Sequence, residues 1–214
     1  MPKNIVKLVI FGVTALLLAG GMVLLGGQAE AQSLPRVEKM TAERALGNKD
    51  AKVTVVEYAS LTCPHCASFY NGPWQALKKE FVDSGKVKFI YRDFPLDRVA
   101  LAASMIARCA PEERYFGIIE LMFKAQDSWR RAANPQAALA NIGRLAGMSK
   151  DTVQACLQNQ AVFDAVMKQR NAGDQQYNVE ATPTFLVNGE KVQTQRILED
   201  YRNVLNEALA KAGN

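Results

Sequence analysis

Two cysteines separated by two residues, Cys63 and Cys66, are the side chains of this sequence whose spacing points most directly to chemistry. Pro64 and His65 lie between them, and the tetrapeptide follows a run of β-branched residues and begins a helical pattern. A thiol at the start of a helix lies beside unpaired backbone N–H groups and the positive end of the helix dipole, which favour the thiolate. A C-x-x-C pair at such a junction predicts thiol–disulfide exchange.

The two cysteines are expected to differ in role. Cys63 precedes the first helical turn, so we expect it to be the low-pKa nucleophile, while Cys66 lies deeper and resolves a mixed disulfide. His65, the single histidine of the chain, is expected to stabilise the Cys63 thiolate. The alternatives are an inert disulfide or half of a zinc site. Zinc takes four ligands, and Cys109 and Cys156 are distant in sequence, so we expect neither a metal nor a cofactor.

Glu57 interrupts an otherwise apolar strand pattern six residues before Cys63. Alternation places it on the same face as Val53, Val55 and Ala59. Its carboxylate either reaches water at the end of the strand or is buried near Cys66 with a raised pKa and moves a proton during exchange. We favour the second interpretation.

Cys109 and Cys156 both fall in a stretch with helical signals. In an oxidising compartment they are expected to form a structural disulfide, with two buried free thiols as the alternative. Four cysteines allow three pairings, and spacing alone does not choose among them.

The element pattern around these residues is that of an α/β protein. Strands are predicted at 53–59, 87–92, 184–187 and 190–192, the last two joined by an Asn-Gly turn. A helix from Pro64 carries apolar residues to Phe81, and Pro73 should kink it near Phe69. Strand, helix and strand make a βαβ unit with parallel strands. Residues 97–175 show only helix signals, and an amphipathic helix ends the chain.

The N-terminus has the order of residues found in an export signal. Lys3 and Lys7 precede an uncharged stretch from Leu8 to Ala29, and Ala29-Glu30-Ala31 resembles a cleavage site. We expect residues 1–31 to be removed as a signal peptide, with retention as a membrane anchor as the alternative. In both cases the remainder is exported to an oxidising compartment, where disulfides persist.

Composition sets broad limits on the class of protein. The chain has 214 residues, a net charge of +5, 49% apolar and 22% charged residues, which exclude a disordered or collagen-like chain. The positive excess is small and forms no Lys/Arg block, so we expect no nucleic-acid partner.

The exported part resembles the bacterial DsbA-type thiol:disulfide oxidoreductases of the thioredoxin superfamily. Five segments carry the resemblance: 45–48, 53–60, Cys63-Pro64-His65-Cys66, Tyr91-Arg92-Asp93-Phe94-Pro95-Leu96, and Thr182-Pro183-Thr184-Phe185. The resemblance implies a thioredoxin-like fold with an inserted all-helical domain. The expected parts are a lead-in at 32–50, the two halves of the thioredoxin-like domain at 51–96 and 176–214, and the insertion at 97–175.

The resemblance also implies roles and partners. Cys63 would carry the mixed disulfide, Cys66 would resolve it and His65 would stabilise the thiolate. Thr182-Pro183 would form a cis-proline loop that faces the cysteines and binds extended substrate. The expected function is donation of the Cys63–Cys66 disulfide to newly exported or unfolded proteins with free thiols in the periplasm. A DsbB-type membrane quinone oxidoreductase would reoxidise the pair. The alternatives are a disulfide isomerase or reductase, or an exported metal-binding or chaperone-like protein that uses the two thiols.

Overall fold

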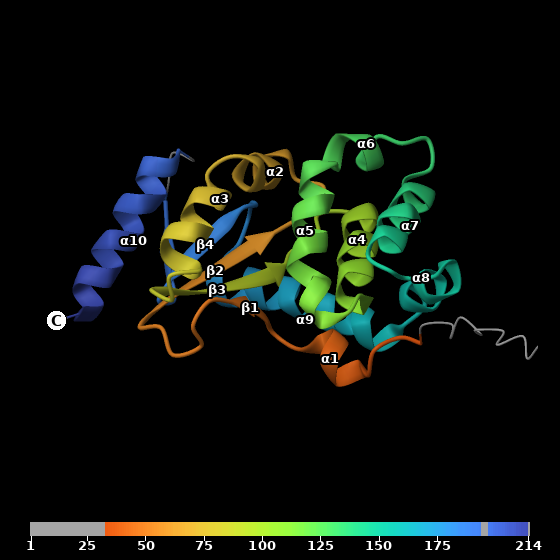
Figure 1. Ribbon diagram of the computed structural model, residues 1–214, viewed down its shortest axis with the longest axis horizontal. Coiled ribbons are helices and arrows are strands. Elements are labelled where there is room, and N and C mark those ends of the chain that lie inside the picture. Colours follow the sequence, from red (N-terminus) through yellow and green to blue (C-terminus); the bar gives the residue numbers. More distant parts are fainter. Residues whose placement is uncertain (1–32, 194–196, 214) are drawn as a thin grey trace, which may run out of the picture. The chain divides into compact units, whose positions relative to one another are not determined.

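A five-stranded sheet lies at the centre of the structure, a computed structural model that describes residues 33–193 and 197–213 (Figure 1). Its strand order is β1-β3-β2-β4-β5. The strands are β1 (Arg44–Leu46), β2 (Val53–Ala59), β3 (Val87–Asp93), β4 (Thr184–Val187) and β5 (Glu190–Val192). The expected signal peptide or anchor, residues 1–31, lies outside the described residues.

The two longest strands, β2 and β3, run parallel, with Val53 opposite Val87 and Ala59 opposite Asp93. β4 pairs antiparallel with β2, and β5 pairs antiparallel with β4. The four strands predicted from β-branched runs and the Asn-Gly turn are thereby confirmed. Both strands of the parallel pair are largely buried, as expected where helices cover the two faces of a sheet.

The segment expected as a lead-in contributes to the sheet. It forms α1 (Val37–Thr41) and the edge strand β1, which pairs antiparallel with β3. A strand of three residues is too short to show a period in sequence. The side chain of Arg44 in this strand is only 3% exposed. A charged residue in a polar segment is normally expected to be exposed, so the sequence does not predict this burial.

The helix after β2 is interrupted between α2 (Pro64–Asn71) and α3 (Trp74–Leu77), and a π-helical turn η1 (Lys78–Val82) follows. The break falls at Gly72, with φ −120° and ψ −102°, rather than near Phe69 as the sequence predicts. Proline disfavours helical dihedrals in the residue that precedes it, so Pro73 ends α2 at this point. The helix that begins at the cysteines is therefore short.

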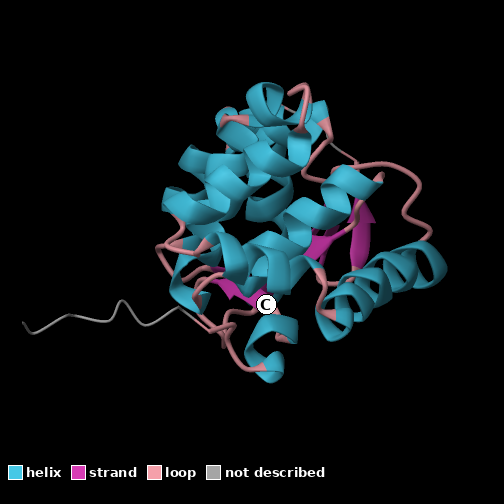
Figure 2. Ribbon diagram, turned by 90° about the vertical axis from the view of Figure 1, so that its right-hand side faces the viewer, coloured by secondary structure: helices cyan, strands magenta, loops and turns pink. Residues whose placement is uncertain are grey.

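All regular structure between residues 97 and 177 is helical. The elements are α4 (Arg98–Cys109), η2 (Glu112–Arg114), α5 (Tyr115–Lys124), α6 (Gln126–Arg130), α7 (Pro135–Leu145), α8 (Lys150–Leu157) and α9 (Gln160–Tyr177). The view from the helical end shows mostly helix, with the strands behind (Figure 2). The last helix of this stretch, α9, extends two residues past 175, the expected end of the helical insertion. It contacts β3, where Gln169 accepts a hydrogen bond from the Asp93 N–H. None of the helices in the described ranges is both long and apolar enough to cross a bilayer.

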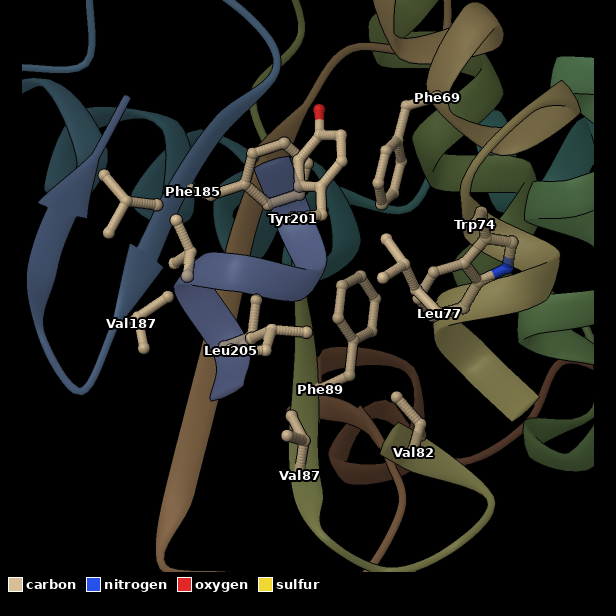
Figure 3. A pocket seen from close by; sticks show the side chains of 13 residues that line it. Phe69, Trp74, Leu77, Val82, Val87, Phe89, Phe185, Val187, Tyr201 and Leu205 are labelled. Carbon is tan, nitrogen blue, oxygen red and sulfur yellow. The ribbon is translucent and has the colours of Figure 1, made fainter. Parts of the chain in front are cut away.

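An apolar core holds α2 and α3 against the sheet. The C-terminal helix α10 (Leu198–Gly213) covers this face with Tyr201 and Leu205. The side chains of Phe69, Phe185 and Tyr201 point toward one another in Figure 3, with ring centroids 4.9–5.3 Å apart. They line a small apolar cavity of about 40 Å³. The aromatic packing fixes the depth and orientation of α2 and hence of the cysteine pair at its start.

Candidate active site

Cys63 is the N-cap residue of α2, and Pro64 is the first helical residue. A tight turn after β2 places it there, with the Cys63 N–H donating to the Ser60 carbonyl at 3.0 Å. Cys63 is 5% exposed and Cys66 is fully buried, and both are free thiols in the structure. The predicted order of the pair along the helix is thus observed: the outer cysteine caps the helix and the inner one faces the core.

The surroundings of Cys63 stabilise its thiolate and lower its pKa to about 5. The largest contribution is a hydrogen bond from the Cys66 thiol, and desolvation opposes it. Thr182 and the backbone N–H groups of Cys66 and His65 lower the pKa further. In the thiol form, Cys63 Sγ donates instead to the Thr182 carbonyl at 3.2 Å. Cys63 is therefore both a good nucleophile and a good leaving group at neutral pH.

Cys66 has the opposite character. Burial raises the pKa of its thiol well above the usual range, and its hydrogen bond to Cys63 and the charge of Glu57 raise it further. At neutral pH this sulfur is a protonated thiol that donates to its neighbour. The two sulfurs of one short loop are thus poised in opposite protonation states.

His65 lies between the cysteines with an exposed side chain. In the structure, the backbone N–H of His65 is hydrogen-bonded to the Cys63 sulfur and lowers the pKa of its thiol. This main-chain donor is one of the two ways, a hydrogen-bond donor or a positive charge, in which His65 is expected to stabilise the thiolate.

Glu57 lies on β2 with no exposed surface. This excludes the interpretation in which its carboxylate reaches water. Desolvation raises the pKa of Glu57 to about 8, and a hydrogen bond from Tyr70 partly opposes the rise. Tyr91 is opposite Glu57 on β3, and Glu57 Oε1 and Tyr91 Oη have no hydrogen-bond partner within the described part of the chain. A carboxyl group that is protonated near neutral pH therefore lies close enough to Cys66 to raise the pKa of its thiol.

The Thr182-Pro183 peptide bond is cis and precedes β4. Thr182 is 4% exposed, and its carbonyl and side chain both face Cys63. The structure thus brings Cys63, Cys66, Glu57 and Thr182 together from three separate segments of the sequence.

A residue that the sequence analysis did not identify completes the positioning of the loop. Gln126 begins α6 and is 4% exposed, and its Nε2 donates to the carbonyls of Leu61 at 2.8 Å and Cys63 at 2.9 Å. Asp97 acts similarly, because it caps α4 and accepts a hydrogen bond from Thr62 at 2.7 Å. A single glutamine in a helical stretch carries no local signal for such a contact.

Cys109 and Cys156 form a disulfide elsewhere in the fold, with Sγ atoms 2.06 Å apart. It joins the end of α4 to α8 and lies apart from the C-x-x-C pair. Within residues 33–193 and 197–213, no three His, Cys, Asp or Glu side chains gather in a way that would hold a metal ion.

Comparison with known proteins gives a consistent result. Residues 39–207 match the family model described as thioredoxin. A Rickettsia bellii protein provisionally named a protein-disulfide oxidoreductase is 31% identical over 171 residues, which cover 79% of this chain and 64% of the relative. The chain spans between 54% and 64% of the length of the Rickettsia relatives that it matches. Disulfide bond formation protein D of Bacillus subtilis is 25% identical, covering 77% of this chain and 76% of that protein.

Solved structures resemble the fold closely. Alpha-DsbA1 of Wolbachia pipientis is 28% identical with a TM-score of 0.73, covering 79% of this chain and 92% of that one. A protein-disulfide isomerase from Novosphingobium aromaticivorans is 26% identical with a TM-score of 0.69, covering 78% of this chain and 97% of that one. The fold predicted from the sequence, a thioredoxin-like sheet with many helices, is confirmed by these likenesses.

Proposed function

The chain belongs to the thioredoxin family, and from this premise we propose that it is a DsbA-type thiol:disulfide oxidoreductase that donates its Cys63–Cys66 disulfide to exported proteins. One observation carries the proposal: Cys63 caps the start of α2 whereas Cys66 is fully buried one turn later, so the pKa of Cys63 is lowered to about 5 while that of Cys66 is raised. This asymmetry stabilises the reduced form as a thiolate. A disulfide whose reduced form is stabilised is a strong oxidant.

The proposed exchange runs in two steps. A substrate thiolate attacks Sγ of Cys63, and the bond to Cys66 breaks so that Cys66 leaves with the electron pair and takes up a proton. A second substrate thiolate then attacks the substrate sulfur of the mixed disulfide, and Cys63 leaves as the stabilised thiolate. The substrate gains a disulfide and loses two electrons, which the cysteine pair receives.

Glu57 is proposed to supply the proton in the first step. A carboxyl group with a pKa of about 8 is largely protonated at neutral pH, and it lies beside a sulfur whose thiolate is strongly disfavoured. The backbone of Thr182, next to the cis proline, is proposed to pair with the extended substrate on the other side of Cys63. His65 is proposed to act through its backbone N–H.

The wider setting is part of the same proposal. Residues 1–31 direct the chain to the periplasm, where it is soluble after cleavage or stays anchored to the inner membrane. Its substrates are unfolded or newly exported proteins with free thiols, and a DsbB-type quinone oxidoreductase restores the disulfide. The reaction needs no cofactor of its own.

The test is the reduction potential of the Cys63–Cys66 pair, measured at equilibrium with glutathione, together with the oxidation of a reduced, unfolded protein. A strong oxidant has a potential near that of DsbA, about −120 mV, whereas thioredoxin lies near about −270 mV. A value near the thioredoxin end would contradict disulfide donation and favour a reductase. The variant Cys63→Ser controls for oxidation by air, and stoichiometric zinc without oxidase activity would favour the metal-binding alternative.

Isomerase activity is the second candidate, since the Novosphingobium protein is named an isomerase. It is separated from oxidase activity by a substrate that already carries wrongly paired disulfides. An isomerase restores the native pairing with its cysteines reduced, whereas a pure oxidase leaves the scrambled substrate unchanged.

A further inference from the structure

A groove that the proposed mechanism does not use lies between α2 and residues of α5 and α6. Figure 1 shows α2 beside α5 in the fold. We call this groove the basic groove. It has a volume of about 560 Å³ and is lined by Pro64, Ala67, Ser68 and Asn71 of α2 and by residues 123–128, 130 and 131. The four α2 residues recur at helical spacing, so they form one stripe along the helix.

The basic groove begins at the reactive cysteine. Pro64 directly follows Cys63, and Gln126 on the opposite wall donates to the Cys63 carbonyl at 2.9 Å. Farther along, Asn71 Nδ2 donates to the Phe123 carbonyl at 3.3 Å and ties α2 to α5. The walls are therefore held by hydrogen bonds at both ends. The groove thus lies next to Cys63 in the chain and in space, although the Cys63 side chain itself does not line it.

Three of the four charged residues that line the groove are basic. The one acid, Asp127, is 77% exposed and shares a single oxygen between Arg130 at 3.4 Å and Arg131 at 3.3 Å. Arg130 Nε is buried and has no hydrogen-bond partner within the described ranges. Lys124 is exposed and forms no ion pair with any residue in those ranges. Positive charge along the groove is thus only partly neutralised by the protein itself.

We propose that the basic groove binds an acidic stretch of the polypeptide that is being oxidised, next to its target cysteine. This inference rests on the proposed function and names the class of substrate that the site favours. The stripe from Pro64 to Asn71 is about 10 Å long, which matches about three residues of extended chain. Small side chains, Ala67, Ser68 and Ser128, leave room for a backbone between the walls. The basic side chains then meet Asp or Glu side chains of the bound segment.

The test compares two dithiol peptides that are identical except that three aspartates or three lysines flank the cysteines. The measured quantity is the ratio of kcat/KM for the acidic peptide to kcat/KM for the basic peptide. In the wild type we expect a ratio above one that decreases as salt is added, because exposed charges are screened. The variant Arg130→Glu/Arg131→Glu should lower the ratio about tenfold, because two ion pairs with the bound acidic peptide are replaced by repulsion.

The matched control is Arg144→Glu/Lys150→Glu, which changes the net charge equally at exposed positions of α7 and α8. It should change the ratio less than about twofold. An equal decrease in both variants would show attraction by overall charge and would overturn the proposal that the groove binds acidic segments. An unchanged ratio in the Arg130→Glu/Arg131→Glu variant would overturn it as well. If the wild-type protein oxidises neither peptide, the proposed function itself fails. Oxidation of both peptides at equal rates overturns only the groove.

Discussion

The hydroxyl of Tyr70 donates a hydrogen bond to Oε2 of Glu57 over 3.0 Å, entirely within the core. Tyr70 lies on α2 one turn after Cys66, so the two residues share the helix face that meets β2. The bond joins the helix that carries the cysteines to the strand that carries the proposed proton donor. It also opposes desolvation and keeps the pKa of Glu57 from rising further.

The variant Tyr70→Phe should raise the pKa of Glu57 above about 8, because the lost hydrogen bond stabilises the charged carboxylate. The carboxyl band of Glu57, assigned by its disappearance in Glu57→Gln, can be followed by infrared titration. Tyr58→Phe is the matched control, since Tyr58 packs in a separate cluster with Phe94, Val179 and Leu186. An unchanged midpoint in Tyr70→Phe would show that the bond does not tune this acid.

Glu57→Gln should stabilise the reduced protein increasingly as the pH rises from about 4.5 to about 8. In this range the folded state keeps the Glu57 proton while the unfolded state releases it, so wild-type stability falls with pH. The expected gain at pH 7 is up to about 3 kcal/mol, measured by denaturant unfolding at several pH values. The two proteins should be similar at pH 4, where both states of the wild type are protonated. A pH-independent difference would contradict the raised pKa.

The same variant tests the proposed proton transfer. Removal of the acid should slow the departure of Cys66 and change the pH profile of substrate oxidation, because the amide has no proton to give at this position. If the stability gain appears and the pH profile of the rate stays the same, Glu57 is a buried acid without a part in the exchange.

Cys66→Ala should raise the pKa of Cys63 above about 5, because the hydrogen bond from the Cys66 thiol is the largest cause of its decrease. Cys66→Ser keeps a donor at this position and should raise the pKa less. The measurement is the far-ultraviolet absorbance of the thiolate, or the rate of alkylation, as a function of pH. Equal pKa values in the wild type and the alanine variant would assign the low pKa to the helix start instead.

Several features could be predicted from sequence because they depend on residues close together in the chain. The β-branched run at 53–59 indicates β2, and side chains of Asn134 and Ser149, residue types that favour the N-cap position, cap α7 and α8. The C-x-x-C pair likewise carries its own helix start with Pro64.

Other features depend on contacts that no local pattern records. Gln126 lies 63 positions after Cys63 in the sequence but donates a hydrogen bond to its carbonyl. The short strand β1 forms by pairing with β3, which no pattern within its three residues predicts. Tyr70 belongs to a helix face of aromatic residues, a pattern that the sequence alone predicts to be part of the hydrophobic core. The bond from its hydroxyl to Glu57 becomes visible only when α2 is placed on the sheet.

The double variant Cys109→Ala/Cys156→Ala should lower the free energy of unfolding by about 4 kcal/mol at most. The disulfide spans 47 residues, and its removal returns the corresponding loop entropy to the unfolded chain. The difference is measured by denaturant unfolding with the Cys63–Cys66 pair kept in one redox state. A variant as stable as the wild type would show that strain or other terms offset the entropy of this crosslink.

Gln126→Met should destabilise the protein and disturb the cysteine loop, because its amide is the donor to two buried carbonyls. Those of Leu61 and Cys63 would lose their partner, at a cost of about 1–3 kcal/mol. Methionine keeps the length of the side chain, so the change removes the hydrogen bonds with little loss of packing. Gln175→Met, at an exposed position of α9, controls for the substitution itself. We expect the Gln126 variant to react more slowly through Cys63 as well, since the loop that presents the sulfur is no longer fixed. A destabilised variant with unchanged Cys63 reactivity would limit Gln126 to a structural role.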